Sequence, residues 1–228
     1  MPSFDIVRHH KAGESFRVQS VIGKFDLQSS EVVERFKGEI ELPESWNVGL
    51  IVGASGTGKT TIAKELFPAA YFDGYKYTHS SVIDDMPEHA KMNEVTRMLS
   101  SVGFSSPPSW LKPYSVLSNG QKMRVDMARS LLMDEPLVVF DEFTSVVDRQ
   151  VAQVGSYAVQ KAVRKLERQF IAVGCHYDVE DWLMPDWVFD TNSMTFRQGA
   201  KKKGQTLGLK YSRQEIKAFG KCLHDTTI

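Results

Sequence analysis

The segment from Gly53 to Thr60 reads GASGTGKT and combines three glycines with a lysine and two threonines. It fits the pattern GxxxxGK[ST], in which the glycines let successive backbone N–H groups face a phosphate. Lys59 would then reach the β and γ phosphates, and the hydroxyl of Thr60 would be a ligand of Mg²⁺. The residues of this predicted nucleotide site are Gly53, Ser55, Gly56, Thr57, Gly58, Lys59, Thr60 and Thr61.

A second candidate for a catalytic segment is LVVFDE, residues 137–142, an apolar run that ends in two carboxylates. Asp141 is suited to hold Mg²⁺ through water, and Glu142 is suited to polarise an attacking water. Many strands end in an acid only for solubility, so this pattern is weak alone. Together with a phosphate loop it predicts nucleotide hydrolysis.

His176 directly follows the apolar run FIAVG, residues 170–174. A lone histidine at the end of a strand is more often a hydrogen-bonded surface residue than a catalytic one. We expect this strand to lie beside the strand of Asp141, which would place His176 near the γ phosphate. The five other histidines have no comparable context.

An alternation of buried strands and helices is expected to position these residues. The runs at 47–53, 137–140 and 170–174 are almost wholly apolar and rich in β-branched residues, which is typical of strands buried on both faces. The phosphate loop follows the first run and opens a helix, which argues against a chance glycine-rich turn. Such an alternation predicts an α/β layer fold. Further predicted strands are 187–190 and 194–196, antiparallel strands with one helical or loop insertion at 4–44, and a small helical insertion at about 78–116.

Composition gives no sign of a special class of protein. The chain has 228 residues, 42% of them hydrophobic and 25% charged, with 28 basic and 28 acidic side chains. Its two cysteines form no metal-binding spacing, and its N-terminus has no apolar segment of a signal peptide. We therefore expect one globular domain in the reducing cytoplasm, with no membrane-spanning segment.

The pentapeptide LSNGQ, residues 117–121, is too polar to serve the core and precedes a helix predicted at about 121–132. With GASGTGKTT, LVVFDE, SVVD (145–148) and GCHYD (174–178), it resembles the signature of an ABC-type ATPase domain. The five segments stand in that family's order and resemble its Walker A, signature, Walker B, D-loop and H-switch motifs. The resemblance covers roughly 15–198 and implies an ABC ATPase domain at 1–198, a helical subdomain at about 78–120 and a basic tail at 199–228.

The resemblance also implies ATP and Mg²⁺ as ligands and a homodimer that forms on ATP binding. In that family two copies meet head to tail, and each signature caps the γ phosphate of the other copy. Ser118 and the N–H of Gly120 would be donors, and the remaining implied contacts are Asn119, Gln121 and Asp148. For stacking on adenine we expect Phe25, although a core role for this residue is equally consistent with the sequence.

The chain departs from the family pattern in two places. Asn119 replaces the central signature glycine, and asparagine is the residue that best tolerates a left-handed backbone after glycine. No glutamine occurs between Gln28 and Gln121, so the family's Q-loop glutamine is missing. Asp84 or Asp85 could take its metal-facing role.

The missing glutamine and the short segment before the signature favour a soluble member with no stable membrane partner. It would act as a switch or clamp on nucleic acid or on a partner protein. PSWLKPYSVLSNGQ is similar to bacterial and phage ABC-like ATPases that sometimes carry an acetyltransferase domain. One alternative is a transporter subunit. Another is a module that holds ATP and hydrolyses it slowly or not at all, and the presence of Glu142 counts against this one. A third, a P-loop kinase, would leave LSNGQ and His176 unexplained. The basic tail could touch DNA or be a solvated face.

Overall fold

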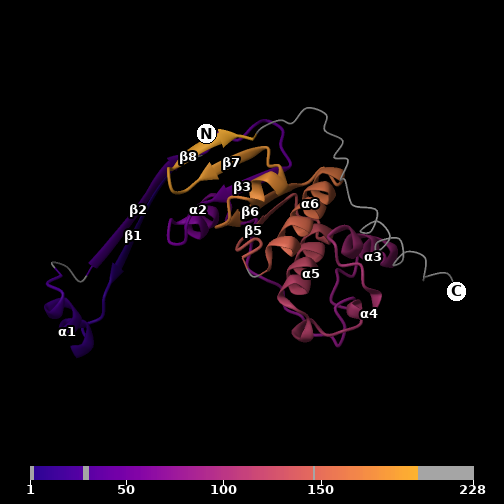
Figure 1. Cartoon of the computed structure of the whole chain (residues 1–228), viewed down its shortest axis with the longest axis horizontal. Helices are drawn as coiled ribbons and strands as arrows, with labels where there is room; N and C mark the ends of the chain where they lie inside the picture. The colour runs from indigo at the N-terminus through magenta and orange to yellow at the C-terminus, as the bar shows by residue number, and fades with distance from the viewer. Residues whose placement is uncertain (1–2, 28–30, 146, 200–228) are drawn as a thin grey trace.

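A six-stranded sheet forms the centre of the molecule (Figure 1). The computed structural model describes residues 3–27, 31–145 and 147–199. The strand order is β4-β5-β6-β3-β7-β8, and every pairing is parallel except that of β8 with β7. The predicted α/β class with a mostly parallel sheet is therefore confirmed. The strands are β3 (Val48–Val52), β4 (Tyr71–Phe72), β5 (Leu137–Phe140), β6 (Gln169–Gly174), β7 (Trp187–Asp190) and β8 (Thr195–Gln198).

Helices cover both faces of the sheet, which explains why its strands read as continuous apolar runs. Leu50, Val138 and Phe170 belong to a core cluster with α3, α5 and α6, whereas the next residue of each strand belongs to a second cluster with α2. The helices are α2 (Lys59–Leu66), α3 (Met92–Ser101), α4 (Pro107–Trp110), α5 (Asn119–Leu132), α6 (Arg149–Lys165) and α7 (Val179–Leu183), with a 3₁₀ turn η1 (Tyr114–Val116).

The N-terminal segment, residues 3–27 and 31–39, forms an arm that projects away from the rest of the molecule (Figure 1). Strands β1 (Ser3–Lys11) and β2 (Glu31–Glu39) pair antiparallel, and helix α1 (Phe16–Lys24) lies at the far end. This agrees with the predicted antiparallel strands with one helical insertion. Only the base of the arm joins the core, where Phe4 contacts Phe189 with ring centroids 5.8 Å apart.

Close packing between β3 and β7 allows no side chain at Gly49. The Trp187 indole is fully buried and stacks edge to face on Trp46, with centroids 5.4 Å apart. A Cβ atom at Gly49 would lie 2.1 Å from this indole. Since this rigid ring sits in the middle of the core, it has no room to move aside.

We expect Gly49→Ala to lower the free energy of unfolding by about 3 kcal/mol, the upper end of the range for overpacking, because the added methyl clashes with the indole. Urea denaturation measures this. Gly23→Ala is the matched control, since Gly23 lies in α1 with no atom within 4 Å of its Cβ position. That control should be neutral or slightly stabilising, and equal losses from both variants would contradict the packing argument.

Candidate functional site

The phosphate loop, Gly53–Thr60, connects β3 to the start of α2. Gly56 and Gly58 have φ angles of 82° and 84°, a left-handed backbone that glycine adopts without strain. Lys59 is buried, and its Nζ donates to the carbonyl oxygen of Ala54 at 2.7 Å. The loop therefore encloses a positive charge at the N-terminus of a helix, which is a suitable place for a phosphate.

Residues after β7 hold the phosphate loop in place. A Cβ at Gly53 would lie 2.1 Å from Oγ1 of Thr191, so this glycine permits close approach of the two segments. The hydroxyls of Thr57 and Thr191 are 2.5 Å apart, and Asn192 accepts a hydrogen bond from the Ala54 N–H at 3.0 Å. Sequence reasoning gave no role to Thr191 or Asn192, which are remote in the chain.

Asp141 follows β5 and contacts both the phosphate loop and strand β4. Its Oδ2 accepts hydrogen bonds from Thr60 Oγ1 at 2.7 Å and from the Tyr71 hydroxyl at 2.5 Å. Its Oδ1 accepts from the backbone N–H of Glu142 at 2.8 Å. The structure thus brings together Thr60 and Asp141, the two residues predicted to hold Mg²⁺.

Tyr71 was missed by the sequence analysis and is the third group around the Asp141 carboxylate. Burial, and then the hydrogen bond to Asp141, raise the pKa of its hydroxyl well above the usual value, so it remains a donor at neutral pH. Lys64 lies over its ring at 4.6 Å from the centroid. Strand β4, which carries Tyr71, has only two residues and shows no periodicity that could be recognised in the sequence.

A cavity of about 270 Å³ lies against the phosphate loop. Glu142 reaches it from the end of β5, and Glu34 and Phe36 reach it from the arm. The remaining lining residues are Ser55, Gly56, Gly58, Lys59, Thr60 and Thr61. The structure therefore brings six of the eight predicted nucleotide-site residues and Glu142 to one cavity, which Gly53 and Thr57 do not line.

Phe25 is not part of this site, and its predicted contact with a nucleotide base is wrong for this conformation. It caps the end of α1 at the far end of the arm, 65% exposed (Figure 1). The aromatic residue beside the phosphate loop is Phe36, whose ring would lie 2.4 Å from a Cβ at Gly58. Phe36 is buried and packs against the phosphate loop at Gly58.

His176 lies just beyond the C-terminal end of β6, half-buried. As expected, β6 pairs directly with β5, and it also pairs with β3. The histidine therefore follows a strand that lies between the strand of Asp141 and the strand of the phosphate loop.

The turn after Asp141 has an unusual backbone. Glu142 and Thr144 have φ angles of 52° and 67°, a region that non-glycine residues rarely occupy and that costs about 1–3 kcal/mol each. The Phe143 N–H between them donates to the Val173 carbonyl at 2.9 Å. Strand β6 therefore helps to hold Glu142 in a strained position at the edge of the cavity.

The signature loop, residues 117–121, begins helix α5. The Ser118 hydroxyl accepts from the Gln121 N–H at 3.3 Å, and the Gln121 side chain accepts from the Ser118 N–H at 3.1 Å, which is a capping box. Asn119 is already helical, so the expected left-handed turn does not occur and the helix starts two residues earlier than predicted. Gly120 faces α6, whose N-cap is Asp148. Within the described ranges, none of the five lines the cavity at the phosphate loop of its own chain.

A hydrogen-bonded cluster supports the signature loop from behind. Asp126 on α5 accepts from the hydroxyls of Tyr77 and Tyr114, both at 2.7 Å, and the two rings stack with centroids 3.8 Å apart. Burial raises the pKa of Asp126 above its usual value, although both hydrogen bonds act in the opposite direction. Tyr114 lies shortly before the signature loop, so the cluster connects this loop to the segment after β4.

Asp84 and Asp85 do not reach the phosphate loop. Asp84 accepts a hydrogen bond from Ser81, and Asp85 accepts from the Thr78 N–H at 3.0 Å and contacts His79 at 2.8 Å. Both carboxylates stabilise their own turn, and neither lines the cavity at the phosphate loop. The predicted metal-facing role is therefore wrong for this conformation.

Comparison with solved structures identifies the fold. A dimeric ATP-binding cassette, MJ0796, in a post-hydrolysis state bound to ADP and Pi, superposes with a TM-score of 0.57 at 14% identity. The match covers 82% of this chain and 92% of that cassette. The chain has the fold of an ABC ATPase domain.

Curated proteins are also similar to this chain in sequence. The thiamine import ATP-binding protein ThiQ of Jannaschia sp. (strain CCS1) is 32% identical over 155 residues, covering 64% of this chain and 65% of the relative. The energy-coupling factor transporter ATP-binding protein EcfA of Aster yellows witches'-broom phytoplasma (strain AYWB) is 24% identical over 174 residues, covering 75% and 59%. The chain thus spans less than two thirds of both relatives. No protein-family model matches it.

The side chains around the phosphate loop fit Mg²⁺ bound together with a nucleotide. Within residues 3–27, 31–145 and 147–199, no group of three or more His, Cys, Asp or Glu side chains could hold a metal by itself. Mg²⁺ typically uses only one or two protein oxygens besides phosphates and water, and Thr60 and Asp141 provide these.

Among residues 3–27, 31–145 and 147–199, no helix is long and apolar enough to cross a membrane. Beyond Gly199, the predicted basic tail lies outside the described residues.

Replacing Asp126 tests the cluster behind the signature loop. Asp126→Ala leaves two half-buried tyrosine hydroxyls without their acceptor, so we expect the free energy of unfolding to fall by about 2–4 kcal/mol in urea denaturation. Asp126→Asn keeps hydrogen-bonding groups at this position and should cost much less. Equal costs for both variants would contradict the proposed hydrogen bonding.

The pH dependence of stability gives a further check on the same residue. Because the pKa of Asp126 is raised in the folded state, the folded protein keeps this proton to higher pH than the unfolded chain. Its contribution to stability is therefore lost as pH rises from about 4 through the folded-state pKa. The stability of the wild type minus that of Asp126→Asn should fall over this interval, and a constant difference would contradict the raised pKa.

Proposed function

We propose that this chain binds ATP with Mg²⁺ and hydrolyses it to ADP and phosphate. The observation that carries this proposal is the 2.7 Å contact between Thr60 and Asp141 beside a phosphate loop that encloses Lys59. A hydroxyl and a carboxylate meet there at the entrance of a helix N-terminus, which matches the needs of a triphosphate and its magnesium ion.

Each residue of the site has a distinct role in this proposal. Lys59 and the N–H groups of the phosphate loop neutralise the β and γ phosphates. Thr60 and Asp141 hold Mg²⁺, which supplies charge stabilisation to the transferred phosphoryl group. Glu142 orients and polarises the attacking water, and His176 contacts the γ phosphate. The position of Glu142 on the cavity supports turnover rather than a module that only holds ATP.

The signature loop supports a head-to-tail homodimer. It does not line the cavity of its own phosphate loop, while it presents the N-terminus of the 14-residue helix α5. The partial positive charge of this helix suits the γ phosphate bound by a second copy. In such a dimer ATP joins the two copies, Ser118, Asn119, Gly120 and Gln121 complete the site of the other copy, and Asp148 lies at the interface.

The names of the relatives bear on the partner of this ATPase. ThiQ is a thiamine import ATP-binding protein and EcfA is a transporter ATP-binding protein, so they favour a transporter subunit as the first candidate. They give no support to the expectation that a membrane partner is absent. A switch or clamp on nucleic acid or on another protein is the second candidate, favoured by the missing Q-loop glutamine.

Glu142→Gln should bind ATP but hydrolyse it at least about 100-fold more slowly, because the amide cannot accept a proton from water. With ATP and Mg²⁺ we expect light scattering to show a stable dimer. Lys59→Ala is the control and should lose both ATP binding and turnover. A Glu142→Gln protein that stays monomeric at saturating ATP would contradict the head-to-tail arrangement. Retention of added duplex DNA by this dimer would favour a clamp on nucleic acid, whereas a dimer that ignores DNA would leave a transporter or another protein as its partner.

Tyr71→Phe should raise the Mg²⁺ concentration for half-maximal ATP hydrolysis by about tenfold, because Asp141 loses a hydrogen bond that orients it. The turnover rate at saturating Mg²⁺ should stay within about twofold, since Tyr71 does not touch the reacting atoms. Tyr157→Phe is the matched control, because no hydrogen bond of the Tyr157 hydroxyl occurs among the described residues. An unchanged Mg²⁺ dependence in Tyr71→Phe would remove this positioning role.

A further inference from the structure

Tyr177 directly follows His176 in the short segment after β6, residues 176–178, which we call the His176 segment. Its hydroxyl donates to the Asp190 carboxylate, with the two oxygens at 3.3 and 3.2 Å, and accepts from the side-chain nitrogen of Asn192 at 2.8 Å. Strand β3 pairs with β6 on one side and with β7 on the other. The hydroxyl therefore joins the segment after β6 to the loop after β7, across the end of β3 where the phosphate loop begins.

The contacts of Tyr177 continue into the phosphate loop. The side-chain oxygen of Asn192 accepts from the Ala54 N–H at 3.0 Å. The carbonyl oxygen of the same Ala54 accepts from Lys59 Nζ at 2.7 Å. Tyr177, Asp190, Asn192 and the Ala54 N–H thus form one hydrogen-bonded group, the Tyr177 network, which ends at the residue that holds Lys59.

The hydrogen bonds of the Tyr177 network can run in only one direction. The Ala54 N–H can only donate, so the amide oxygen of Asn192 must face it and the NH₂ group must face Tyr177. The tyrosine hydroxyl then has its proton free for the carboxylate of Asp190. Partial burial, and then the charge of Asp190, raise the pKa of Tyr177 above its usual value, so this proton is kept at neutral pH. Every donor of the network therefore faces an acceptor.

The other side of the His176 segment is attached to α6. Arg149, the first residue of that helix, donates from Nε to Asp178 at 3.0 Å. Its guanidinium group also lies 4.9 Å from the centroid of the Trp182 ring. Among the described residues, the side-chain hydrogen bonds of the His176 segment go to α6 and to the Tyr177 network. Without the Tyr177 hydroxyl, only the bond to α6 would remain.

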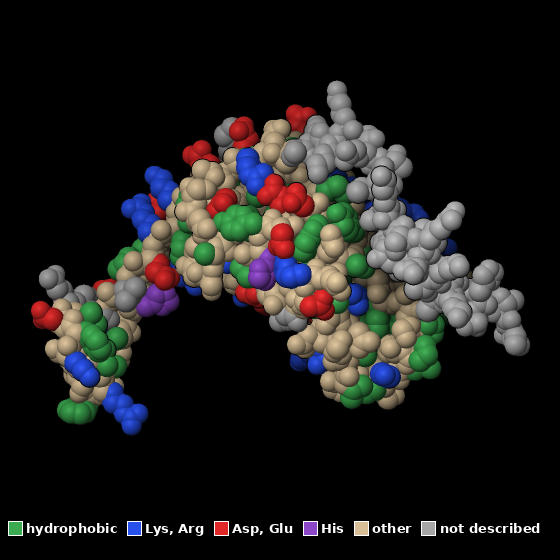
Figure 2. All heavy atoms as spheres, viewed as in Figure 1, with side chains coloured by type: hydrophobic (Ala, Val, Ile, Leu, Met, Phe, Trp, Pro, Cys, Tyr) green, Lys and Arg blue, Asp and Glu red, His purple; other side chains and the backbone are tan. Residues whose placement is uncertain are grey.

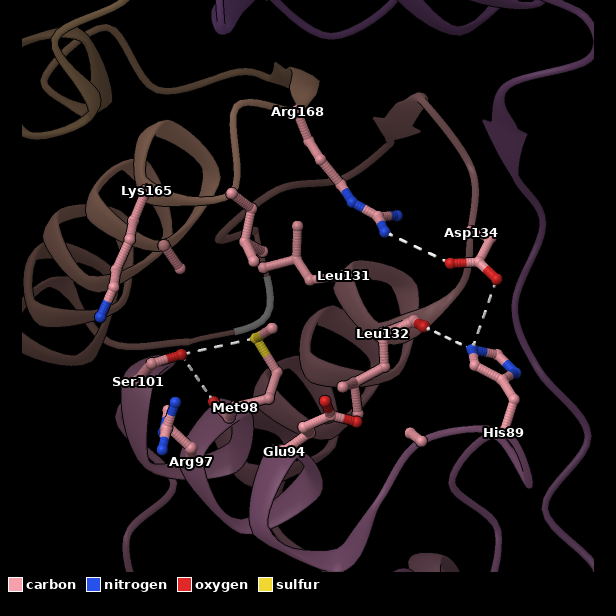
Figure 3. Close-up of a pocket in the computed structure, with 13 residues that line it drawn as sticks. His89, Glu94, Arg97, Met98, Ser101, Leu131, Leu132, Asp134, Lys165 and Arg168 are labelled. Carbon is pink, nitrogen blue, oxygen red and sulfur yellow. Dashed lines mark hydrogen bonds and ion pairs between the residues drawn. The ribbon is translucent and has the colours of Figure 1, made fainter.

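Polar contacts on other parts of the described surface stay local. In the groove between α3, α5 and α6, Asp134 contacts Arg168 at 3.6 Å and His89 at 3.8 Å, and Figure 3 shows that these contacts lie within the groove. The arm stands clear of the body beyond its base (Figure 2), and the ion pairs of its described residues join its own two strands. The Tyr177 network differs from both, because it ends at the phosphate loop.

We propose that Tyr177 is a positioning residue of the ATPase reaction, which through Asn192 and Ala54 sets the distance between His176 and Lys59. Both side chains must reach one γ phosphate, so the spacing of their two segments decides whether they act on it together. This inference rests on the proposed ATPase function and deepens it by naming the residues that keep this spacing. Tyr177 itself touches neither the phosphate nor the attacking water, and it acts through His176.

Tyr177→Phe removes the hydroxyl and keeps the ring. We expect kcat for ATP hydrolysis to fall about tenfold, because the His176 segment is no longer held at the phosphate loop. The Kd for ATP, measured in the Glu142→Gln background, should change less than about threefold, since Lys59 and the loop N–H groups remain. Tyr157→Phe is the matched control and should alter neither quantity. A Tyr177→Phe enzyme with the kcat of the wild type would overturn the proposal.

A double variant separates positioning from general damage to the fold. In a His176→Ala background, Tyr177→Phe should lower kcat by less than about twofold, because its effect runs through the imidazole that is already missing. A further tenfold loss in the double variant would contradict the proposal, since the hydroxyl would then act on another group or on the stability of the fold.

A measurement without nucleotide keeps this inference distinct from the proposed ATPase. In NMR of the full chain, exchange of the Ala54 N–H with water should speed up at least about fivefold in Tyr177→Phe, because Asn192 loses the partner that orients its amide. Asn192→Ala removes the acceptor itself and should have at least as large an effect, whereas Tyr157→Phe should have none. Unchanged exchange in both network variants would overturn the inference. A chain that shows these changes yet hydrolyses no ATP would contradict the proposed function, not the role of Tyr177 in spacing the two segments.

Discussion

The carboxylate of Asp141 is the point at which the local structures of this protein converge. It accepts hydrogen bonds from the phosphate loop, from β4 and from the turn that carries Glu142. Thr60 of the phosphate loop and Tyr71 of β4 lie 81 and 70 positions before Asp141 in the chain, and they meet it because parallel strands end at the same edge of the sheet. The strand order β4-β5-β6-β3 places β5, with Asp141 at its end, between β4 and the strands that carry His176 and the phosphate loop.

The signature loop is positioned by different forces from those that form the phosphate loop. Its helix start is fixed by the capping box of Ser118 and Gln121, and the Asp126 cluster joins this helix to Tyr77 in the segment after β4. Each half of the proposed composite site is therefore shaped before two copies meet. Such preorganisation reduces the ordering that nucleotide-driven association would require.

Motifs with a local mechanism could be predicted from the sequence, and contacts set by distant segments could not. The pairing of Thr60 with Asp141 follows from two buried strands, each with a polar end. Phe25 was assigned from its position in the chain, but the length of the arm carries it away from the site. Tyr71 lies in a strand too short to show a pattern. The early start of α5 was readable, because Ser118 followed by Gln121 three residues later is the sequence form of a capping box.

The contact of Lys59 with Ala54 has a thermodynamic consequence. Its ammonium group already donates to the carbonyl oxygen of Ala54 at 2.7 Å inside the loop. A phosphate that binds there exchanges one hydrogen bond for a stronger, charge-assisted one, and it finds a side chain whose rotamers are already restricted. The enthalpy gained by this lysine is smaller than for a free ammonium group, and the loss of conformational entropy is smaller as well. Affinity at this position therefore depends on how firmly the loop already holds this lysine.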